Sequence, residues 1–188
     1  MIQIKNNFLE EILNNFNLLV STSRFNEVNA IAEIWFTLLT CGDKYPIISR
    51  IQYPGLITAA THIDNREVIR KIKILLEKDP DFFQFILKIV PIDYVCETRL
   101  NIIKSFVEKY YHLYLNKDDS FKIELNRRKN KVIERNTFIE VIAKVFNNKV
   151  DLDNPDKILR VELLGNISGI SFLTPNDTII AYNKYNQL

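Results

Sequence analysis

The sequence predicts an α/β (α+β) fold made of two small units, and three patterns carry the prediction. Residues 16–92 read as strand–helix–strand–strand–helix–strand, which is the order of a ferredoxin-like domain. Residues 121–164 read as strand, helix and strand, and a helical crossover indicates that the two strands pair in parallel. Gly165-Asn166 then separates two apolar runs, which predicts a hairpin and an antiparallel strand over 167–173. The second unit should therefore contain a mixed sheet.

Length, charge and cysteines narrow the class of protein. A chain of 188 residues suits two small packed units, and we expect a leading helix over 1–15, a ferredoxin-like domain over 16–92 and a second α/β domain over 93–188. The net charge of +2 argues against indiscriminate coating of nucleic acid, so binding would need a local patch. Cys41 and Cys96 form no CxxC pair, which predicts a reduced, cytoplasmic protein without disulfide or zinc. No apolar run is long enough to span a bilayer, and the first residues lack the features of a signal peptide.

The first 45 residues predict helix, strand and helix. The leading helix is indicated by apolar residues on one helical face, namely Phe8, Leu9, Ile12 and Leu13. A strand is expected over 16–20, after which Thr22 or Ser23 should cap the next helix, because a hydroxyl can accept a bond from a first-turn N–H. One stripe of that helix, formed by Val28, Ile31, Trp35 and Leu38, predicts that Trp35 packs in the core.

The rest of the first unit should be two strands, a helix and a strand. The expected strands, 46–52 and 56–62, are joined by Tyr53-Pro54-Gly55-Leu56. Proline at the second position and glycine at the third fit a type II turn, which requires a positive φ at its third residue. Asp64 should then cap a helix that ends before Pro80, and a strand over 82–90 should follow.

The second unit should begin with a helix over 98–115 that buries apolar and aromatic residues, namely Ile103, Phe106, Val107, Tyr110 and Tyr114. A strand over 121–125 follows, and then a helix whose inward residues are Ile139, Ile142, Ala143 and Phe146. The last strand of the crossover is expected over 158–164. Residues 178–188 are compatible with either a strand or a helix.

A cationic loop marks the corner between the strand at 121–125 and the helix after it. Its candidate binding residues are Arg127, Arg128, Lys129, Lys131 and Arg135. Residues 121–135 contain six Lys or Arg and two Glu, a local excess of +4 against +2 for the whole chain. Ligands of open α/β sheets bind beyond the carboxyl ends of the strands, where helix N-termini attract anions. We therefore predict phosphate binding at this corner, with a solvated surface loop as the alternative.

Residues for catalysis, metals and cofactors are not evident. His62 and His112 stand in unrelated contexts, and no GxSxG, GxGxxG or P-loop sequence occurs. The aspartates of 151–156 fit a turn better than a calcium loop, which would need a glycine and a terminal glutamate. The first unit also lacks the aromatic sequence with which an RNA recognition motif stacks bases. We expect no enzyme activity, no metal and no cofactor.

Several segments resemble a known family. SFKIELNRR (120–128), DLDNPDKI (151–158) and VELLGNISGISFL (161–173) resemble the core of a THUMP domain. FNLLVSTSR (16–24), YPGLI (53–57) and VPIDYVCET (90–98) resemble the THUMP proteins that assist tRNA cytidine acetylation. The resemblance runs in order over residues 16–175.

This resemblance implies a ferredoxin-like domain packed on a THUMP domain, which together recognise the acceptor stem and 3′ end of tRNA. It implies a stand-alone adaptor that presents tRNA to a separate N4-cytidine acetyltransferase, with no residues left over for a catalytic domain. Arg127 and Arg128 fall on the family's basic strand end, whereas Lys129, Lys131 and Arg135 are candidates from local charge. Other readings stay open: an RNA-binding module for tRNA methylation or thiolation, a fragment of a catalytic tRNA-modifying enzyme, or a regulatory module that binds an acidic protein or a phosphate ligand.

Overall fold

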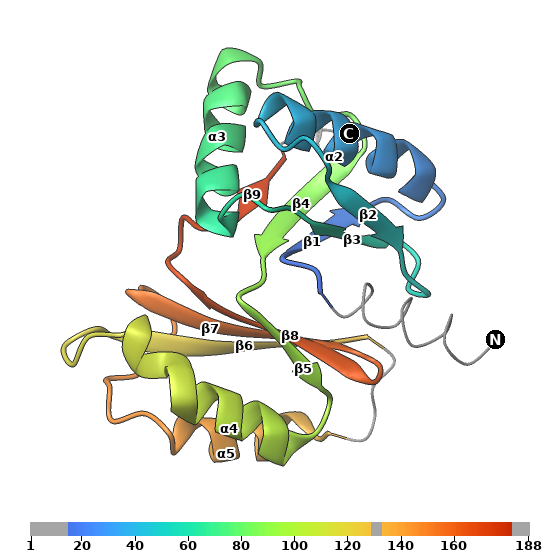
Figure 1. The fold of residues 1–188 in the computed structure, drawn as a ribbon. Helices are drawn as coiled ribbons and strands as arrows, with labels where there is room; N and C mark the ends of the chain where they lie inside the picture. The colour runs from blue at the N-terminus through green and yellow to red at the C-terminus, as the bar shows by residue number, and fades with distance from the viewer. Residues whose placement is uncertain (1–14, 129–132, 182–188) are drawn as a thin grey trace, which may run out of the picture. The chain divides into compact units, whose positions relative to one another are not determined.

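The computed structural model describes residues 15–128 and 133–181 (Figure 1). Contacts between residues divide the chain into two compact units. The first runs to Ile92 and includes the segment from Asp177 onward, and the second is Asp93–Asn176. The leading helix expected over 1–15 lies, except for Asn15, outside the described residues.

The first unit is a five-stranded antiparallel sheet with two helices. Its strand order is β2-β3-β1-β4-β9, and each pair of neighbours is antiparallel. The first four strands and both helices have the predicted ferredoxin-like order. The elements are β1 (Leu18–Thr22), α2 (Glu27–Thr40), β2 (Ile47–Arg50), β3 (Leu56–Ala60), α3 (Asn65–Lys78), β4 (Ile86–Pro91) and β9 (Ile179–Ile180).

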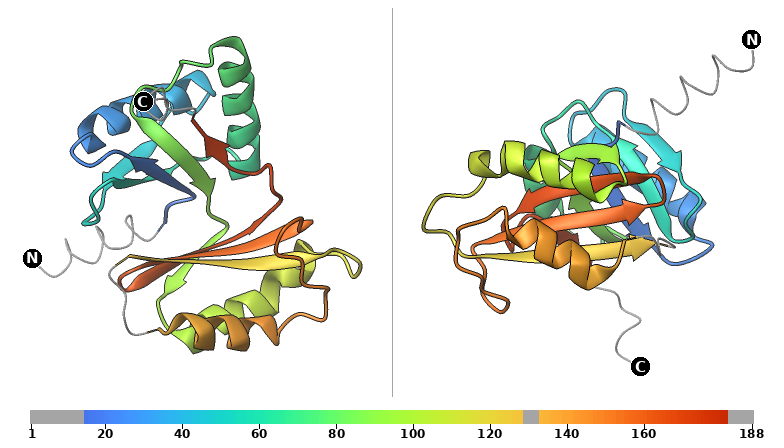
Figure 2. Two further views of the ribbon diagram at one scale, coloured as in Figure 1. Left: turned by 180° about the vertical axis from the view of Figure 1, so that it is seen from behind. Right: turned by 90° about the horizontal axis from the view of Figure 1, so that it is seen from below.

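Helices α2 and α3 cover one face of this sheet (Figures 1 and 2). Alternate residues of β1, Leu18 and Val20, point to that face and are fully buried, as period-two patterning requires. Ile34 of α2 and Ile72 of α3 are also fully buried in the same cluster. The core of this unit therefore lies between the sheet and its two helices.

Two local predictions in this unit are confirmed. Gly55 has φ +78°, and the Leu56 N–H donates to the Tyr53 carbonyl at 3.1 Å, as in a type II turn. Asp64 caps α3, because its carboxylate accepts hydrogen bonds from the backbone N–H groups of Arg66 and Glu67, both at 3.0 Å.

The predicted start of α2 is wrong, and its predicted buried face is right only in part. The helix begins at Glu27 with Asn26 as its N-cap and no side-chain cap bond, while the Thr22 hydroxyl donates to the Phe85 carbonyl at 2.7 Å. Trp35 and Val28 are exposed, at 49% and 67%, and the buried apolar residues are Ala30, Ile34 and Leu38, so Leu38 is the one member of the predicted stripe that is fully buried. The helix is apolar on two faces, and its periodicity does not show which of them meets the sheet.

The second unit is a four-stranded mixed sheet, which confirms the predicted α/β class. Its order is β5-β8-β7-β6, with β6 and β7 parallel and the other pairs antiparallel. The Gly165-Asn166 hairpin is present, with Gly165 at φ +70°. The elements are β5 (Tyr94–Glu97), α4 (Leu100–Tyr110), a 3-10 turn (Tyr111–Leu113), β6 (Phe121–Arg128), α5 (Arg135–Ala143), β7 (Lys157–Leu164) and β8 (Ile167–Leu173).

Helices α4 and α5 pack side by side on one face of this sheet (Figure 1). Ile103 and Val107 of α4 are fully buried, as predicted, and Phe138 and Ile142 anchor α5. Ile139, predicted to face inward, is only partly buried, because the fully buried row of α5 begins one residue earlier. A cluster of aromatic rings lines one side of this core, with Tyr94 and Tyr110 stacked at 4.2 Å.

Strands β5, β6 and β9 differ from expectation. β5 is not among the predicted strands, and β6 extends three residues beyond the expected 121–125, so that it includes Arg127 and Arg128. Residues 178–188, which the sequence leaves open as a strand or a helix of the second domain, include β9, which pairs with β4 in the sheet of the first unit. That pairing depends on a partner about ninety residues away in sequence, which local patterns do not reveal. Residues 182–188 lie outside the described chain.

Candidate nucleic-acid interface

One end of the second unit's sheet gathers strand ends and helix starts. Because β6 and β7 are parallel and in register, Arg128 lies beside Leu164, and the hairpin turn follows at once. Strand β5 ends at the same place, where Glu97 pairs with Ile167, the first residue of β8. Helices α4 and α5 both begin here (Figure 1). We call this region, with its four arginines Arg99, Arg127, Arg128 and Arg135, the cationic end.

Two of the predicted binding residues are tied to the backbone. The Arg127 guanidinium donates from Nη1 to the Ile133 carbonyl at 3.0 Å, and Arg135 donates from Nη1 to the Leu125 carbonyl at 2.9 Å. The sequence places Arg127 after the strand expected over 121–125, whereas the structure has it on β6, with one N–H of its guanidinium used internally. Both residues remain exposed, so their other N–H groups can still meet an anion.

Arg128 differs from its neighbour. Successive residues of a strand point to opposite faces, so Arg128 points away from the face to which Arg127 and the helices belong. Its side chain is exposed, and it has no ion pair or hydrogen bond with residues 15–128 or 133–181. Lys129 and Lys131, the other predicted binding residues, lie outside the described chain.

The N-terminus of α5 already holds a carboxylate. Glu134 is the N-cap, and its Oε2 accepts a hydrogen bond from the Thr137 N–H at 2.7 Å. The backbone N–H groups of Asn136 and Thr137, with a smaller contribution from the charge of Arg127, hold the pKa of Glu134 below its ordinary value. The expectation that this helix start itself would bind phosphate therefore needs correction, since its first-turn donors are engaged by the protein's own anion.

The start of α4 is not capped by a carboxylate, whereas the start of α5 is capped by Glu134. Arg99 is the N-cap of α4 and provides no side-chain cap, and the first turn contains no acidic residue. The Arg99 guanidinium pairs with Glu97 at 2.7 Å, with both side chains about half exposed. Arg99 is absent from the sequence-based candidates because β5 is not among the predicted strands. The run Tyr94-Val95-Cys96, in which an aromatic and a β-branched residue favour a strand, is the signal that would have placed Arg99 after a strand end.

A chain of ion pairs occupies the opposite face of β6 and β7. Arg160 joins Glu124 at 3.0 Å and Glu162 at 2.7 Å, and Lys122 joins Glu124 at 3.1 Å. Lys122 is one of the six cations counted in the sequence, and this pairing neutralises it far from the strand end. The charge excess of the segment is therefore concentrated at the cationic end.

Other polar residues that could form a site make structural contacts instead. His62 pairs through Nδ1 with the buried carboxylate of Asp43 at 2.7 Å, and Asp151 accepts turn hydrogen bonds from Asp153 and Asn154. In the described residues, no three His, Cys, Asp or Glu side chains are placed to hold a metal ion. None of the described helices has the length and apolar character to cross a membrane.

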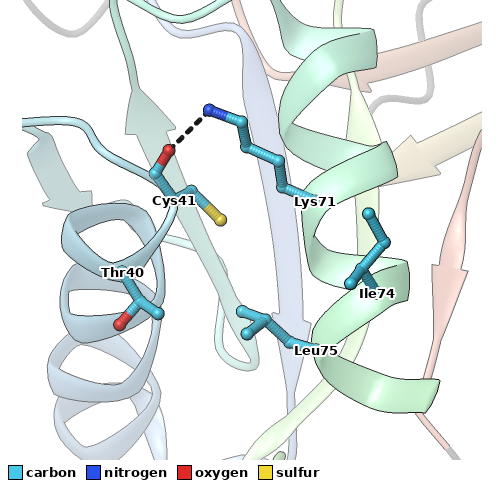
Figure 3. Close-up of a pocket in the computed structure, with 5 residues that line it drawn as sticks. All are labelled: Thr40, Cys41, Lys71, Ile74 and Leu75. Carbon is cyan, nitrogen blue, oxygen red and sulfur yellow. Dashed lines mark hydrogen bonds between the residues drawn. The ribbon is translucent and has the colours of Figure 1, made fainter. Parts of the chain in front are cut away.

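A small cavity lies between α2 and α3 (Figure 3). It has a volume of about 270 Å³, and Lys71 donates across it from Nζ to the Cys41 carbonyl at 2.8 Å. Burial raises the pKa of the Cys41 thiol, which keeps it protonated and a poor nucleophile. The cavity is lined by Thr40, Cys41, Lys71, Ile74 and Leu75, a set that does not resemble a catalytic site.

Comparison with known proteins identifies the second unit. The THUMP domain family model matches residues 97–173, so this part of the chain is a THUMP domain. The THUMP domain-containing protein 1 homolog of Drosophila melanogaster is 32% identical over 109 residues, which are 55% of this chain and 33% of that protein. The tRNA acetyltransferase TAN1 of Saccharomyces cerevisiae is 28% identical over 116 residues, 55% of this chain and 40% of that protein. The matched residues thus cover well under half of the length of these relatives.

Solved structures share the fold. PH1313 from Pyrococcus horikoshii superimposes with a TM-score of 0.66 at 16% identity, covering 89% of this chain and 56% of that one. A 4-thiouridine synthetase in complex with RNA and ATP superimposes with a TM-score of 0.52 at 14% identity, covering 89% and 42%. At these identities the likeness shows the fold alone.

Proposed function

We propose that this chain binds tRNA through the cationic end and takes part in tRNA modification. The observation that carries the proposal is the coincidence of a THUMP domain over 97–173 with four arginines at one end of its sheet. Arginine is suited to phosphate, because its planar guanidinium presents several donors in a fixed geometry. A relative named as a tRNA acetyltransferase and a solved RNA complex with the same fold support tRNA as the partner.

The finer proposal is a non-catalytic, cytoplasmic adaptor. It presents the acceptor stem and 3′ end of tRNA to a separate N4-cytidine acetyltransferase and needs no cofactor or metal of its own. The proposed site comprises Arg127, Arg128 and Arg135 from the sequence, together with Lys129 and Lys131, and the structure adds Arg99. The cationic end consists of strand ends and helix starts, so it suits the few phosphates of a strand terminus better than a long duplex.

Binding should depend on the single-stranded 3′ end of the tRNA. A minihelix made of the acceptor stem and its 3′ overhang should bind nearly as well as whole tRNA. Removal of the overhang should weaken binding about tenfold, or about 1.4 kcal/mol, because the terminal phosphates are lost. Titration of whole tRNA, the intact minihelix and the trimmed minihelix at one fixed salt concentration measures this. Equal affinity for both minihelices would contradict recognition of the 3′ end.

Acetylation assays test the adaptor role. With acetyl-CoA and tRNA, the chain alone should produce no N4-acetylcytidine, whereas addition of a tRNA cytidine acetyltransferase should give more product than that enzyme forms alone. Mass spectrometry of digested tRNA measures the modified nucleoside. Product formed by the chain alone would overturn the adaptor proposal. Tight tRNA binding without any stimulation would instead favour an RNA-binding module for another modification, for which the 4-thiouridine synthetase fold is the precedent.

A further inference from the structure

The three arginines at the β6–α5 corner have unequal surroundings. Arg127 and Arg135 each donate to a backbone carbonyl, and each bond joins β6 to the segment at the start of α5. The bonds are reciprocal, since Arg127 of β6 reaches Ile133 and Arg135 of α5 reaches back to Leu125. Arg128 makes no such bond to the described residues. The corner therefore contains a pair of cross-links and a separate exposed cation.

The position of Leu125 explains why its carbonyl needs a partner. β6 is the last strand of its sheet, so one side of its backbone has no neighbouring strand. Phe121 bonds on that side, because its N–H donates to Lys149 at 2.9 Å and its carbonyl accepts from Asp151 at 3.0 Å. Backbone groups of residues two apart point the same way, so the Leu125 carbonyl also faces the open side. The Arg135 guanidinium satisfies this carbonyl in place of a strand.

The second cross-link secures the other end of the same segment. Ile133 is only 7% exposed and belongs to the core under the sheet, and its carbonyl accepts the bond from Arg127. Glu134 follows as the N-cap of α5, and the charge of Arg127 contributes to keeping it ionised. Residues 133–135 are thus held to β6 by one buried side chain and two guanidinium bonds.

We infer that Arg127 and Arg135 are positioning residues that lock the start of α5 to the edge of β6, while Arg128 is the phosphate contact of this corner. The inference rests on the proposed function, because it divides the roles of residues within the proposed tRNA site. These two hydrogen bonds hold the ligand-facing groups of the corner in place before RNA binds, which reduces the conformational entropy lost on binding. The two positioning arginines then act as one unit rather than as two independent contacts.

Matched methionine variants separate the two roles. Arg127→Met, Arg135→Met and Arg128→Met each remove one charge and keep a long side chain, but only the first two remove a carbonyl bond. In the free protein, hydrogen exchange at the first turn of α5 should become about tenfold faster in the first two variants and stay unchanged in Arg128→Met. Since the measurement contains no RNA, it judges the lock separately from the proposed function.

Titration with tRNA at several salt concentrations tests the roles of the three arginines in binding. Arg128→Met should reduce the slope of log affinity against log salt by about one unit, as expected for one lost phosphate contact. The double variant of Arg127 and Arg135 should lose little more affinity than either single variant, because one lost bond already releases the segment. Additive losses of affinity with unchanged exchange would overturn the inference and leave tRNA binding at this corner intact. Normal tRNA affinity in all variants would place the RNA site elsewhere and overturn the proposed function here.

Discussion

Gly55→Val should destabilise the first unit by about 3 kcal/mol or more. Gly55 has φ +78°, a conformation that a β-branched residue adopts only with strain. A Cβ at this position would lie 2.8 Å from the Thr22 carbonyl oxygen, a backbone atom that cannot move without disturbing β1. The same turn is tied to α2, because the Gly55 N–H donates to the buried Glu27 carboxylate at 2.6 Å. Urea or thermal unfolding measures the loss.

Gly42 provides the matched control. Its φ is +98°, but the nearest atom to an added Cβ is Lys71 Nζ at 4.0 Å, the end of a flexible side chain. Gly42→Ala should therefore cost only the conformational strain, about 1 kcal/mol. Comparison with Gly55→Ala isolates the steric contribution at the turn. Equal destabilisation by the two alanine substitutions would show that the contact with Thr22 has no energetic weight.

Phe138→Ala should destabilise the second unit by about 3–5 kcal/mol. Phe138 is fully buried in the first turns of α5, where it packs in the same core cluster as Val161 and Ile170 of the sheet. The substitution leaves a cavity that the surrounding strands can close only in part. Because Arg135 lies three residues earlier in the same helix, tRNA binding at the cationic end should weaken as well. Chemical denaturation and tRNA titration measure the two effects.

Phe25→Ala is the control for the loss of an aromatic ring. Phe25 is 91% exposed, so removing its ring should change the free energy of unfolding by no more than about 0.5 kcal/mol. A comparable loss from both substitutions would mean that burial does not set the contribution of Phe138. It would also weaken the assignment of α5 to the core of the second unit.

Local chemistry in the sequence correctly predicts much of the fold. The Tyr53–Leu56 turn and the Asp64 cap follow from backbone rules that act within a few residues, so they could be predicted without knowledge of distant contacts. The parallel pairing of β6 and β7 follows from the helix that connects them. The same patterns place Arg127, Arg128 and Arg135 at the carboxyl end of the sheet, where the structure also has them.

The sequence by itself therefore determined the α/β class, the order of the first six elements and the corner that carries the arginines. Only the tertiary structure decided which face of α2 is buried, because Trp35 and Ile34 both lie on apolar faces of that helix. It also decided that β9 joins the first sheet and that β5 brings Arg99 to the cationic end. The hydrogen bonds of Arg127 and Arg135 to backbone carbonyls were likewise decided only by the tertiary structure. Both bonds depend on backbone groups that strand pairing brings together. Residue type and spacing do not show which carbonyl at the edge of a sheet lacks a partner strand.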